Sequence, residues 1–483
     1  MQPMLHWHPA MPEAEESALL QPAYDVDSVT PGIAHFGVGN FHRSHQAMYL
    51  DRLMALGVHN DWGIIGIGVM PGDAAMRDAL TGQNYRYTLV AKANDGSLAA
   101  REIASIRGFL FAPDDPEAVL YQLVNPAIRI VSLTITEGGY NIDPETGEFD
   151  LQNPGIQRDL ADSGNPATVF GYITEALRRR RDAGVKPFTV MSCDNLPGNG
   201  EVTRRAILSY AGALDESLAG WIDEVVAFPN SMVDRITPVT TDADRELVAR
   251  EFGIDDAWPV VTEPFSQWVL EENFCNDRPA FEQVGVQITD DVAPYELMKL
   301  RLLNGSHQAM AYVGILSGYE YVHEAVSDPA IERFLRAYLS EARRTLHPVS
   351  GIDAEEYIET LFERFRNPHI ADTLARLAVD ASDRIPKFVL PAIRDNLAAG
   401  RPITMGAAVV ASWQRYLQEH SQIGDAMSEQ LLLHAVSHRD FVRFPPVFGS
   451  LAENGRFLAE YSRVTASLAD VSCRDWAGSL TAF

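Results

Sequence analysis

Residues 33–45 read IAHFGVGNFHRSH, an apolar run that ends at two glycines and continues as an amphipathic, helix-like segment. Gly37 and Gly39 form the junction between the two patterns. At such a junction a dinucleotide pyrophosphate rests against backbone N–H groups at the start of a helix. Glycine suits this position because the backbone must turn tightly and approach the phosphates. His42 replaces the third glycine of the GxGxxG pattern, so a tight turn without function is the alternative interpretation.

The sequence around this motif alternates between short apolar runs and helical patterns. Apolar runs of strand length occupy residues 33–39, 62–69, 128–136 and 187–193, with helix-like stretches at 42–57 and 168–184. Near-continuous apolar strands that alternate with helices are typical of a parallel, doubly wound sheet. We therefore predict an α/β fold with a Rossmann-type nucleotide-binding domain, and a turn or small hairpin at 143–150.

Helical periodicity dominates after about residue 290. The stretches that begin at Tyr295, Asp328, Ala354 and Ile403 all read as amphipathic helices, and several start after a capping residue. The predicted organisation is a Rossmann-type domain over residues 1–289 and a mainly α-helical substrate and catalytic domain over 290–483. A chain of 483 residues is also too long for a single hydrophobic core.

Composition excludes several classes of partner. The chain has 39 Lys and Arg against 66 Asp and Glu, a net charge of −27, which disfavours nucleic acids and anionic membranes. Cys193, Cys275 and Cys473 are far apart, so neither a disulfide framework nor a cysteine zinc site is expected. The first twenty residues lack the pattern of a secretory signal, and we expect a cytoplasmic protein.

The second apolar run bears on the choice of cofactor. Asp73 follows the strand at 64–70 by three residues and is placed to reach ribose hydroxyls, although it is also a plausible cap for the next helix. No arginine follows the strand directly to receive a 2′-phosphate, so we expect NAD in preference to NADP. Arg77 keeps the second cofactor open.

Another polar group follows the fourth apolar run. In open α/β sheets, ligands bind outside the carboxyl ends of the strands, which is where Asn195 of the sequence Asp-Asn-Leu-Pro falls. Its amide is placed to touch a substrate oxygen. The same residues are also good turn formers.

The most informative polar residues lie in a leucine-rich helical pattern, KLRLLNGSH at 299–307. With about 100° per residue and Lys299 at zero, Glu296 falls at roughly 60°, His307 at roughly 80° and Asn304 at roughly 140°. A lysine among apolar neighbours should lose affinity for its proton and suits a general base. Asparagine stabilises an oxyanion and histidine orients a hydroxyl, whereas this set does not suit a metal. The alternative is a snorkelling lysine followed by an Asn-Gly cap.

Taken together, the motifs resemble those of the long-chain, polyol-specific dehydrogenases, the mannitol dehydrogenase family. The resemblance covers nearly the whole chain and rests on the segments GVGNFHRSHQAMY, VSLTITEGGY, TVMSCDNLPGNG, FPNSMVDRITP, EPFSQWVLEENF and PYELMKLRLLNGSH. It implies a zinc-independent oxidoreductase that interconverts a sugar alcohol and its ketose with NAD, D-mannitol and D-fructose being the first expectation.

The resemblance also implies roles for particular residues. The expected catalytic residues are Lys299, Asn195, Asn304, His307 and Glu296, with Glu296 on a proton path. The expected substrate contacts are Asp234, Arg376 and Arg384, the last at a position where relatives carry lysine. The expected cofactor contacts are Phe36, Gly37, Val38, Gly39, Asn40, Phe41, His42, Arg43 and Asp73.

Several alternatives stay open from the sequence. A D-arabinitol or sorbitol dehydrogenase, or a fructuronate reductase, would share these motifs. A non-catalytic NAD-binding sensor belongs to another class, but a sensor has no need of a base. The expected partner is a small-molecule polyol or ketose. The resemblance also implies a monomer or weak homo-oligomer, because the family is often monomeric, and no exposed heptad pattern indicates a coiled-coil partner.

Overall fold

The structure is a computed structural model and describes residues 19–143, 147–469 and 471–480. Most of the residues behind the prediction of no secretory signal lie outside these ranges, as does the middle of the turn predicted at 143–150. On either side of that gap, Ile142 and Phe149 form an antiparallel bridge. Among the described residues, one compact unit ends at Ala293 and another begins at Pro294.

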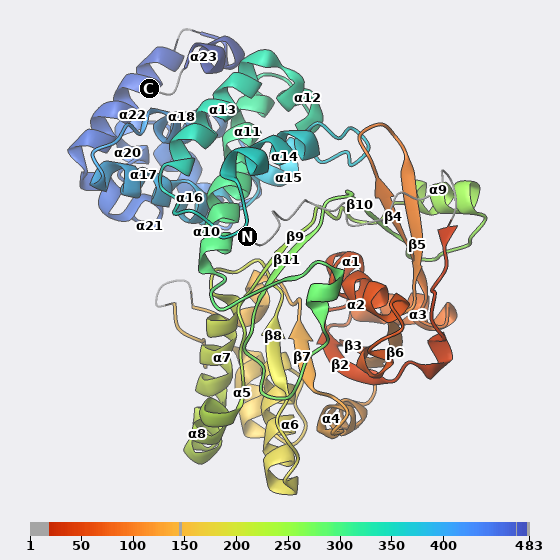
Figure 1. Cartoon of the computed structure of the whole chain (residues 1–483). Coiled ribbons are helices and arrows are strands. Elements are labelled where there is room, and N and C mark those ends of the chain that lie inside the picture. Colours follow the sequence, from red (N-terminus) through yellow and green to blue (C-terminus); the bar gives the residue numbers. More distant parts are fainter. Residues whose placement is uncertain (1–18, 144–146, 470, 481–483) are drawn as a thin grey trace. The chain divides into compact units, whose positions relative to one another are not determined.

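The first unit is built on a parallel five-stranded sheet (Figure 1). Its order is β6-β3-β2-β7-β8, and all four pairings are parallel. The strands are β2 (Pro31–Phe36), β3 (Gly63–Gly68), β6 (Ile106–Phe111), β7 (Ile130–Leu133) and β8 (Thr189–Ser192). The chain winds outward from β2 in one direction and then returns to wind outward in the other, which confirms the predicted doubly wound sheet.

Helices cover both faces of this sheet because neighbouring residues of each strand point to opposite sides. Ala34 and Phe36 join a core with α4 to α8, whereas Ile33 joins a second core with α2 and α3. The helices of this unit are α1 (Asn40–Ser44), α2 (Gln46–Ala55), α3 (Asp73–Gly82), α4 (Pro116–Val124), α5 (Pro154–Ala161), α6 (Val169–Ala183), α7 (Asn199–Leu214), α8 (Glu216–Val225) and α9 (Asp242–Phe252).

Two smaller mixed sheets were not predicted. One has the order β1-β5-β4-β10 and the other the order β12-β11-β9. Their strands are β1 (Leu19–Leu20), β4 (Tyr87–Lys92), β5 (Leu98–Ile103), β9 (Ser231–Asp234), β10 (Val260–Thr262), β11 (Gln267–Glu271) and β12 (Gln287–Thr289). Helix α9 packs against strands β4, β5 and β10, outside the central sheet. The antiparallel hairpin β4–β5 turns at Asn94-Asp95-Gly96, and Asp-Gly is the sequence signal that marks such a turn.

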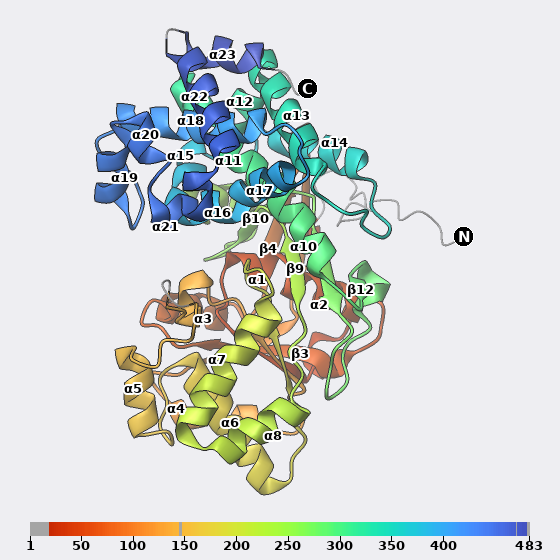
Figure 2. The same ribbon diagram turned by 90° about the vertical axis from the view of Figure 1, so that its left-hand side faces the viewer.

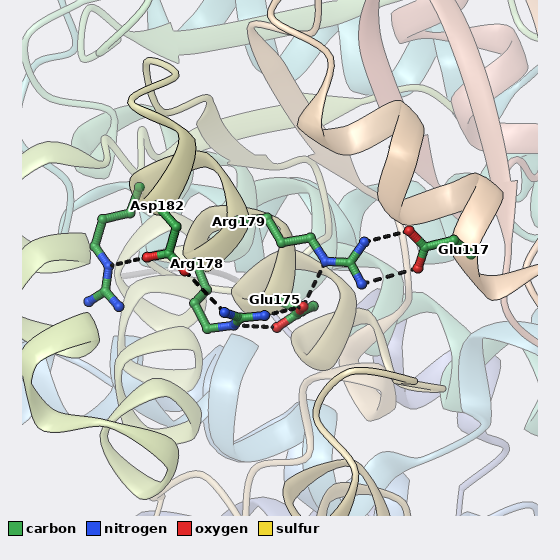
Figure 3. A network of polar contacts seen from close by, with 6 residues as sticks. Glu117, Glu175, Arg178, Arg179 and Asp182 are labelled. Carbon is green, nitrogen blue, oxygen red and sulfur yellow. Dashed lines mark hydrogen bonds and ion pairs between the residues drawn. The ribbon is translucent and has the colours of Figure 1, made fainter.

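A basic run near the end of α6 is fully engaged in ion pairs and hydrogen bonds. Figure 3 shows the buried Glu175 accepting from Arg178 and Arg179, while Arg179 also reaches Glu117 on α4 at 2.6 Å. Arg180 is buried and donates to four backbone carbonyls, each 2.7–2.8 Å away. The run therefore ties α6 to its neighbours and does not present a free basic patch.

The second unit is helical, and α11 (Gly305–Leu316) is its central helix. Helix α11 packs against α12, α13, α15, α16 and α18 (Figure 2). Because α11 is enclosed by other helices, residues 309–313 are fully buried. The helices before and around it are α10 (Ala293–Lys299), α12 (Val322–Ser327), α13 (Pro329–Arg343), α14 (Ala354–Phe365), α15 (Leu374–Ala378), α16 (Ala381–Phe388), α17 (Leu390–Ala398), α18 (Thr404–Glu419), α19 (Ser428–Ala435), α20 (His438–Phe441), α21 (Pro445–Phe448), α22 (Gly455–Leu468) and α23 (Cys473–Ser479). Within the described ranges no helix is both long and apolar enough to span a bilayer.

Candidate functional site

The glycine turn after β2 has the backbone that the sequence predicts. Gly37 has a φ of +89°, and a Cβ at this position would lie 2.0 Å from the carbonyl oxygen of Thr134. A Cβ at Gly39 would have nothing nearer than 3.9 Å, so the backbone there is open to a close neighbour. Strand β2 ends at Phe36 and α1 begins at Asn40. A dinucleotide pyrophosphate fits this turn, because one glycine makes the bend and the other leaves room for phosphate.

The helix predicted over 42–57 is divided into α1 and α2 at His45, whose backbone is not helical. Arg43 and Ser44, just before the break, are tied to other parts of the unit: Arg43 donates to the carbonyl of Trp258 and Ser44 pairs with Thr237 at 2.7 Å. Local periodicity could not reveal a break that distant contacts hold in place.

Several of the predicted cofactor residues turn their side chains into the protein. Phe36 and Val38 belong to the two cores on either side of the sheet. The Asn40 amide donates to the Pro238 carbonyl at 2.9 Å, and Arg43 is completely buried. Since these side chains are engaged elsewhere, only their backbone groups are available to a ligand at this turn.

A pair of stacked histidines underlies the same turn. The rings of His35 and His42 are stacked with centroids 3.4 Å apart, and His35 bonds to Ser132 at 2.8 Å and Thr134 at 2.9 Å. Burial lowers the pKa of His35 to about 3, and it lowers the pKa of His42 well below its usual value, with a further contribution from His35. Both rings are therefore neutral at physiological pH. His42 was predicted from the sequence as a cofactor contact, whereas His35 was not, because it lies inside an apolar strand.

Asp73 lies beside Gly68 at the carboxyl end of β3. It is the first residue of α3, and its Oδ2 accepts a hydrogen bond from the Met70 N–H at 2.9 Å. The nearby Arg77 is ion-paired with Asp114 at 2.6 Å and Asp78 at 2.8 Å. The carboxylate of Asp73 thus lies near the strand edge, whereas the arginine already has acidic partners.

The loop after β8 presents Asn195 at the surface and buries the residue before it. Asp194 accepts from the N–H groups of Ile135 and Thr136 and from the Tyr140 hydroxyl. Burial raises the pKa of Asp194 to about 6, against the opposing effect of these hydrogen bonds. Asn195 was predicted from the sequence as a functional residue and Asp194 was not, although an aspartate directly after an apolar run of strand length is a usable signal. Asp234, another predicted ligand, is buried at the end of β9.

In the helical unit, the predicted polar residues flank a single π-helical turn, η5 (Leu300–Asn304). Lys299 ends α10, Asn304 ends the π-turn and His307 lies in the first turn of α11. The N–H of Gly305 bonds to the Leu300 carbonyl, five residues back. Lys299 and Asn304 are also five residues apart. Across a π-turn their angular separation about the helix axis is therefore roughly 40°, as for residues four apart in an α-helix. The predicted separation of roughly 140° is wrong because it assumed an unbroken α-helix.

This segment forms a buried polar site. Lys299 is only 7% exposed. Asn304 Oδ1 and His307 Nε2 are both buried without a hydrogen-bond partner among the described residues. Burial lowers the pKa of His307 well below its usual value, and the nearby charges of Arg376, Arg364, Arg384 and Lys299 lower it further. A neutral histidine and two unsatisfied polar atoms in such a place are features of a ligand site.

The predicted substrate arginines lie in the same unit as these residues. Arg376 forms a two-point contact with Asp372, both bonds being 2.6 Å long. Arg384 donates to the carbonyls of Arg376 and Leu377. Lys299, Arg376 and Arg384 all lie close enough to His307 for their charges to lower its pKa. In the described ranges, no group of three or more His, Cys, Asp or Glu side chains is placed to hold a metal ion.

A doubly wound parallel sheet with a glycine turn at its central strand defines a Rossmann-type nucleotide-binding protein, here with a helical domain that carries a buried lysine site. The sequence matches the mannitol dehydrogenase Rossmann domain over residues 31–283 and the mannitol dehydrogenase C-terminal domain over residues 291–461. The chain belongs to the mannitol dehydrogenase family.

Individual relatives agree with this assignment. Mannitol 2-dehydrogenase of Cereibacter sphaeroides is 45% identical over 92% of this chain and 95% of the relative, and that of Pyricularia oryzae is 43% identical over 95% and 94%. The structure of Pseudomonas fluorescens mannitol 2-dehydrogenase in ternary complex with NAD and D-mannitol is 46% identical, with a TM-score of 0.86 over 95% of this chain and 96% of that one. A substrate-free D-sorbitol dehydrogenase is 38% identical with a TM-score of 0.89, over 95% and 97% of the two chains.

Proposed function

We propose that this polyol dehydrogenase interconverts D-mannitol and D-fructose with NAD, using Lys299 as general acid and base without a metal. The observation that carries the proposal is the π-turn, which aligns the buried Lys299 with Asn304 beside a neutral His307. Relatives named mannitol 2-dehydrogenase, at 43–45% identity over most of the chain, support the choice of substrate.

The chemistry follows from the residue types. Burial disfavours an ammonium ion, so the Lys299 amine is proposed to be neutral and to accept the proton of the reacting hydroxyl. Asn304 and Asn195 are proposed to donate to the same oxygen as negative charge grows on it, a contribution of about 10²–10³ in rate per donor. His307 orients the hydroxyl, and Glu296, one turn before Lys299, passes the proton to water. Bound NAD supplies the acceptor for the hydride of the alcohol carbon.

The preference for NAD is proposed from the end of β3. A 2′-phosphate would meet the carboxylate of Asp73, and Arg77 already has two acidic partners. The negative charges of the carboxylate and of a 2′-phosphate would repel each other, whereas the carboxylate can accept hydrogen bonds from ribose hydroxyls. The backbone of Gly37 and Gly39 is proposed to hold the pyrophosphate, together with the neighbouring backbone of the 36–43 segment.

A second candidate substrate is a hexuronate. The positive charges of Arg364, Arg376 and Arg384 all lower the pKa of His307. Clusters of arginine bind carboxylates well. Against it, Arg376 is already neutralised by Asp372. Asp234, Arg376 and Arg384 are proposed substrate contacts in either case. A rate comparison of mannitol, arabinitol, sorbitol and fructuronate with NAD(H) and NADP(H) separates these substrates.

The test of the proposal is Lys299→Ala. We expect turnover to fall by at least about 100-fold while NADH binding, followed by fluorescence, survives. Lys387→Ala is the matched control, because this lysine is exposed in the same unit and ion-paired with Asp383. If Lys299→Ala turns over at the wild-type rate, Lys299 is not the general acid and base. If the wild-type protein binds NADH but no polyol or ketose changes its absorbance, the protein is a sensor.

A further inference from the structure

Thr136 has a backbone conformation that its side chain does not favour. Its φ is +66° and its ψ is 164°, a region populated essentially by glycine. For a β-branched residue, a positive φ is a genuine outlier. Thr136 is also exposed, so burial of its side chain does not compensate for the strain. Strained residues of this kind cluster at ligand sites and persist only where their surroundings hold them.

Asp194 is hydrogen-bonded to the backbone of this strained residue and of its neighbour. Its Oδ1 accepts from the Thr136 N–H at 2.9 Å, and its Oδ2 accepts from the Ile135 N–H at 3.0 Å. The Tyr140 hydroxyl donates to the same Oδ2 at 2.7 Å and contacts Ser192 Oγ at 2.5 Å. The carboxylate at the end of β8 therefore fixes both ends of the turn Thr136–Tyr140, which follows β7.

The clamped turn adjoins the glycine turn of the central strand. Thr134 donates through its Oγ1 to the Gly37 carbonyl at 2.7 Å, and its own carbonyl occupies the space that a Cβ on Gly37 would need. Strands β2 and β7 are the pair at which the winding direction of the sheet reverses. Ligands of doubly wound sheets bind outside the strand ends at that point.

We propose that Asp194 is a positioning residue that holds Thr136 in its strained conformation and so fixes the Thr136–Tyr140 turn as a wall of the dinucleotide site. This inference rests on the proposed binding of NAD. It goes further in assigning a role to a carboxylate whose oxygens accept hydrogen bonds from the protein itself. The alternative is that Asp194 only stabilises the fold.

The test is a double-mutant cycle with Asp194→Asn and Thr136→Gly, read out as the Kd for NADH. Glycine adopts this backbone conformation without penalty, so in the Thr136→Gly variant the turn depends less on the hydrogen bonds of Asp194. We expect Asp194→Asn to weaken NADH binding at least about tenfold in the wild-type background and less than about threefold in the Thr136→Gly background. Equal losses in both backgrounds, or no loss in a folded Asp194→Asn variant, would overturn the proposal.

Asp159→Asn is the matched control, because Asp159 is also buried and also accepts from two consecutive backbone N–H groups, those of Ala167 and Thr168. We expect it to lower the melting temperature without changing the Kd for NADH. If Asp194→Asn does not fold, Thr136→Gly and Tyr140→Phe decide. Thr136→Gly should raise the melting temperature, and Tyr140→Phe should weaken NADH binding. If either result is not observed, the proposed role of Asp194 is wrong. Absence of NADH binding by the wild-type protein would instead refute the proposed function.

Discussion

Gly305 offers a direct way to move the π-turn. A Cβ at this position would lie 2.4 Å from the hydroxyl oxygen of Tyr338 on α13 and 3.2 Å from the Phe388 carbonyl oxygen. The Tyr338 hydroxyl is buried and has no hydrogen-bond partner among the described residues. Gly305→Ala therefore forces the buried Tyr338 side chain, α13 or the π-turn to shift, and the π-turn carries Asn304 directly before Gly305.

The magnitude follows from two opposing terms. Overpacking of this kind costs about 1–3 kcal/mol, whereas alanine in place of glycine within a helix gains about 1 kcal/mol. The net loss of stability is thus small, on the order of 0–2 kcal/mol. The effect on activity is larger, because a displacement of about 1 Å at reacting groups can cost about 100-fold in rate. We expect kcat to fall about 10- to 100-fold, while the affinity for NADH is unchanged.

Tyr338→Phe separates the clash from any other effect of the alanine. Removing a hydroxyl without a partner should be neutral or slightly stabilising. In the double variant the nearest remaining atoms are the Phe388 carbonyl oxygen at 3.2 Å and the Tyr338 Cζ at 3.3 Å, so most of the strain is gone. Steady-state kinetics and thermal melting of the two single variants and the double variant complete the cycle. If Tyr338→Phe does not restore kcat in the Gly305→Ala background, the π-turn is not what aligns the site.

Two other predictions concern charge. Burial raises the pKa of Glu341 from 4.5 to about 7, although the carboxylate accepts from the N–H groups of Met405 and Gly406. The folded state thus binds this proton more tightly, so the stabilisation is complete below about pH 4.5 and is lost as the pH rises through about 7, in total about 3 kcal/mol. Glu341→Gln cannot ionise, and its melting temperature should fall less than that of the wild type between pH 5 and 8. An identical pH dependence would contradict this reasoning. Asp73→Ser removes the charge that a 2′-phosphate would meet, and should raise the ratio of kcat/KM for NADP over NAD by about tenfold. An unchanged ratio would show that Asp73 does not select the cofactor.

The fold could be predicted wherever local pattern and tertiary role agree. Strands of the central sheet are buried on both faces, so their apolar runs at 62–69 and 187–193 were visible as strands, although each proved shorter than its run. The mixed sheets were missed because β10 and β12 have only three residues each, and β10 pairs with β4, which lies about 170 residues earlier. Asp194 was missed for a related reason, since its acceptors are filled by residues about sixty positions earlier in the chain.

The π-turn shows most clearly where local reasoning stops. Leucine-rich residues 299–303 favour an ordinary α-helix, and an inserted residue leaves no local signal. The turn is held by distant contacts: Arg301 donates to the Thr345 carbonyl at 2.9 Å and pairs with Asp395, and Gly305 lies against Tyr338. The prediction that the polar residues lie on one side of the helix still holds. The π-turn reduces the angular separation of Asn304 from Lys299, so it moves the two residues closer together. The proposed chemistry rests on residue types that the sequence shows, whereas the alignment of Lys299 with Asn304 depends on partners forty to ninety residues further along the chain.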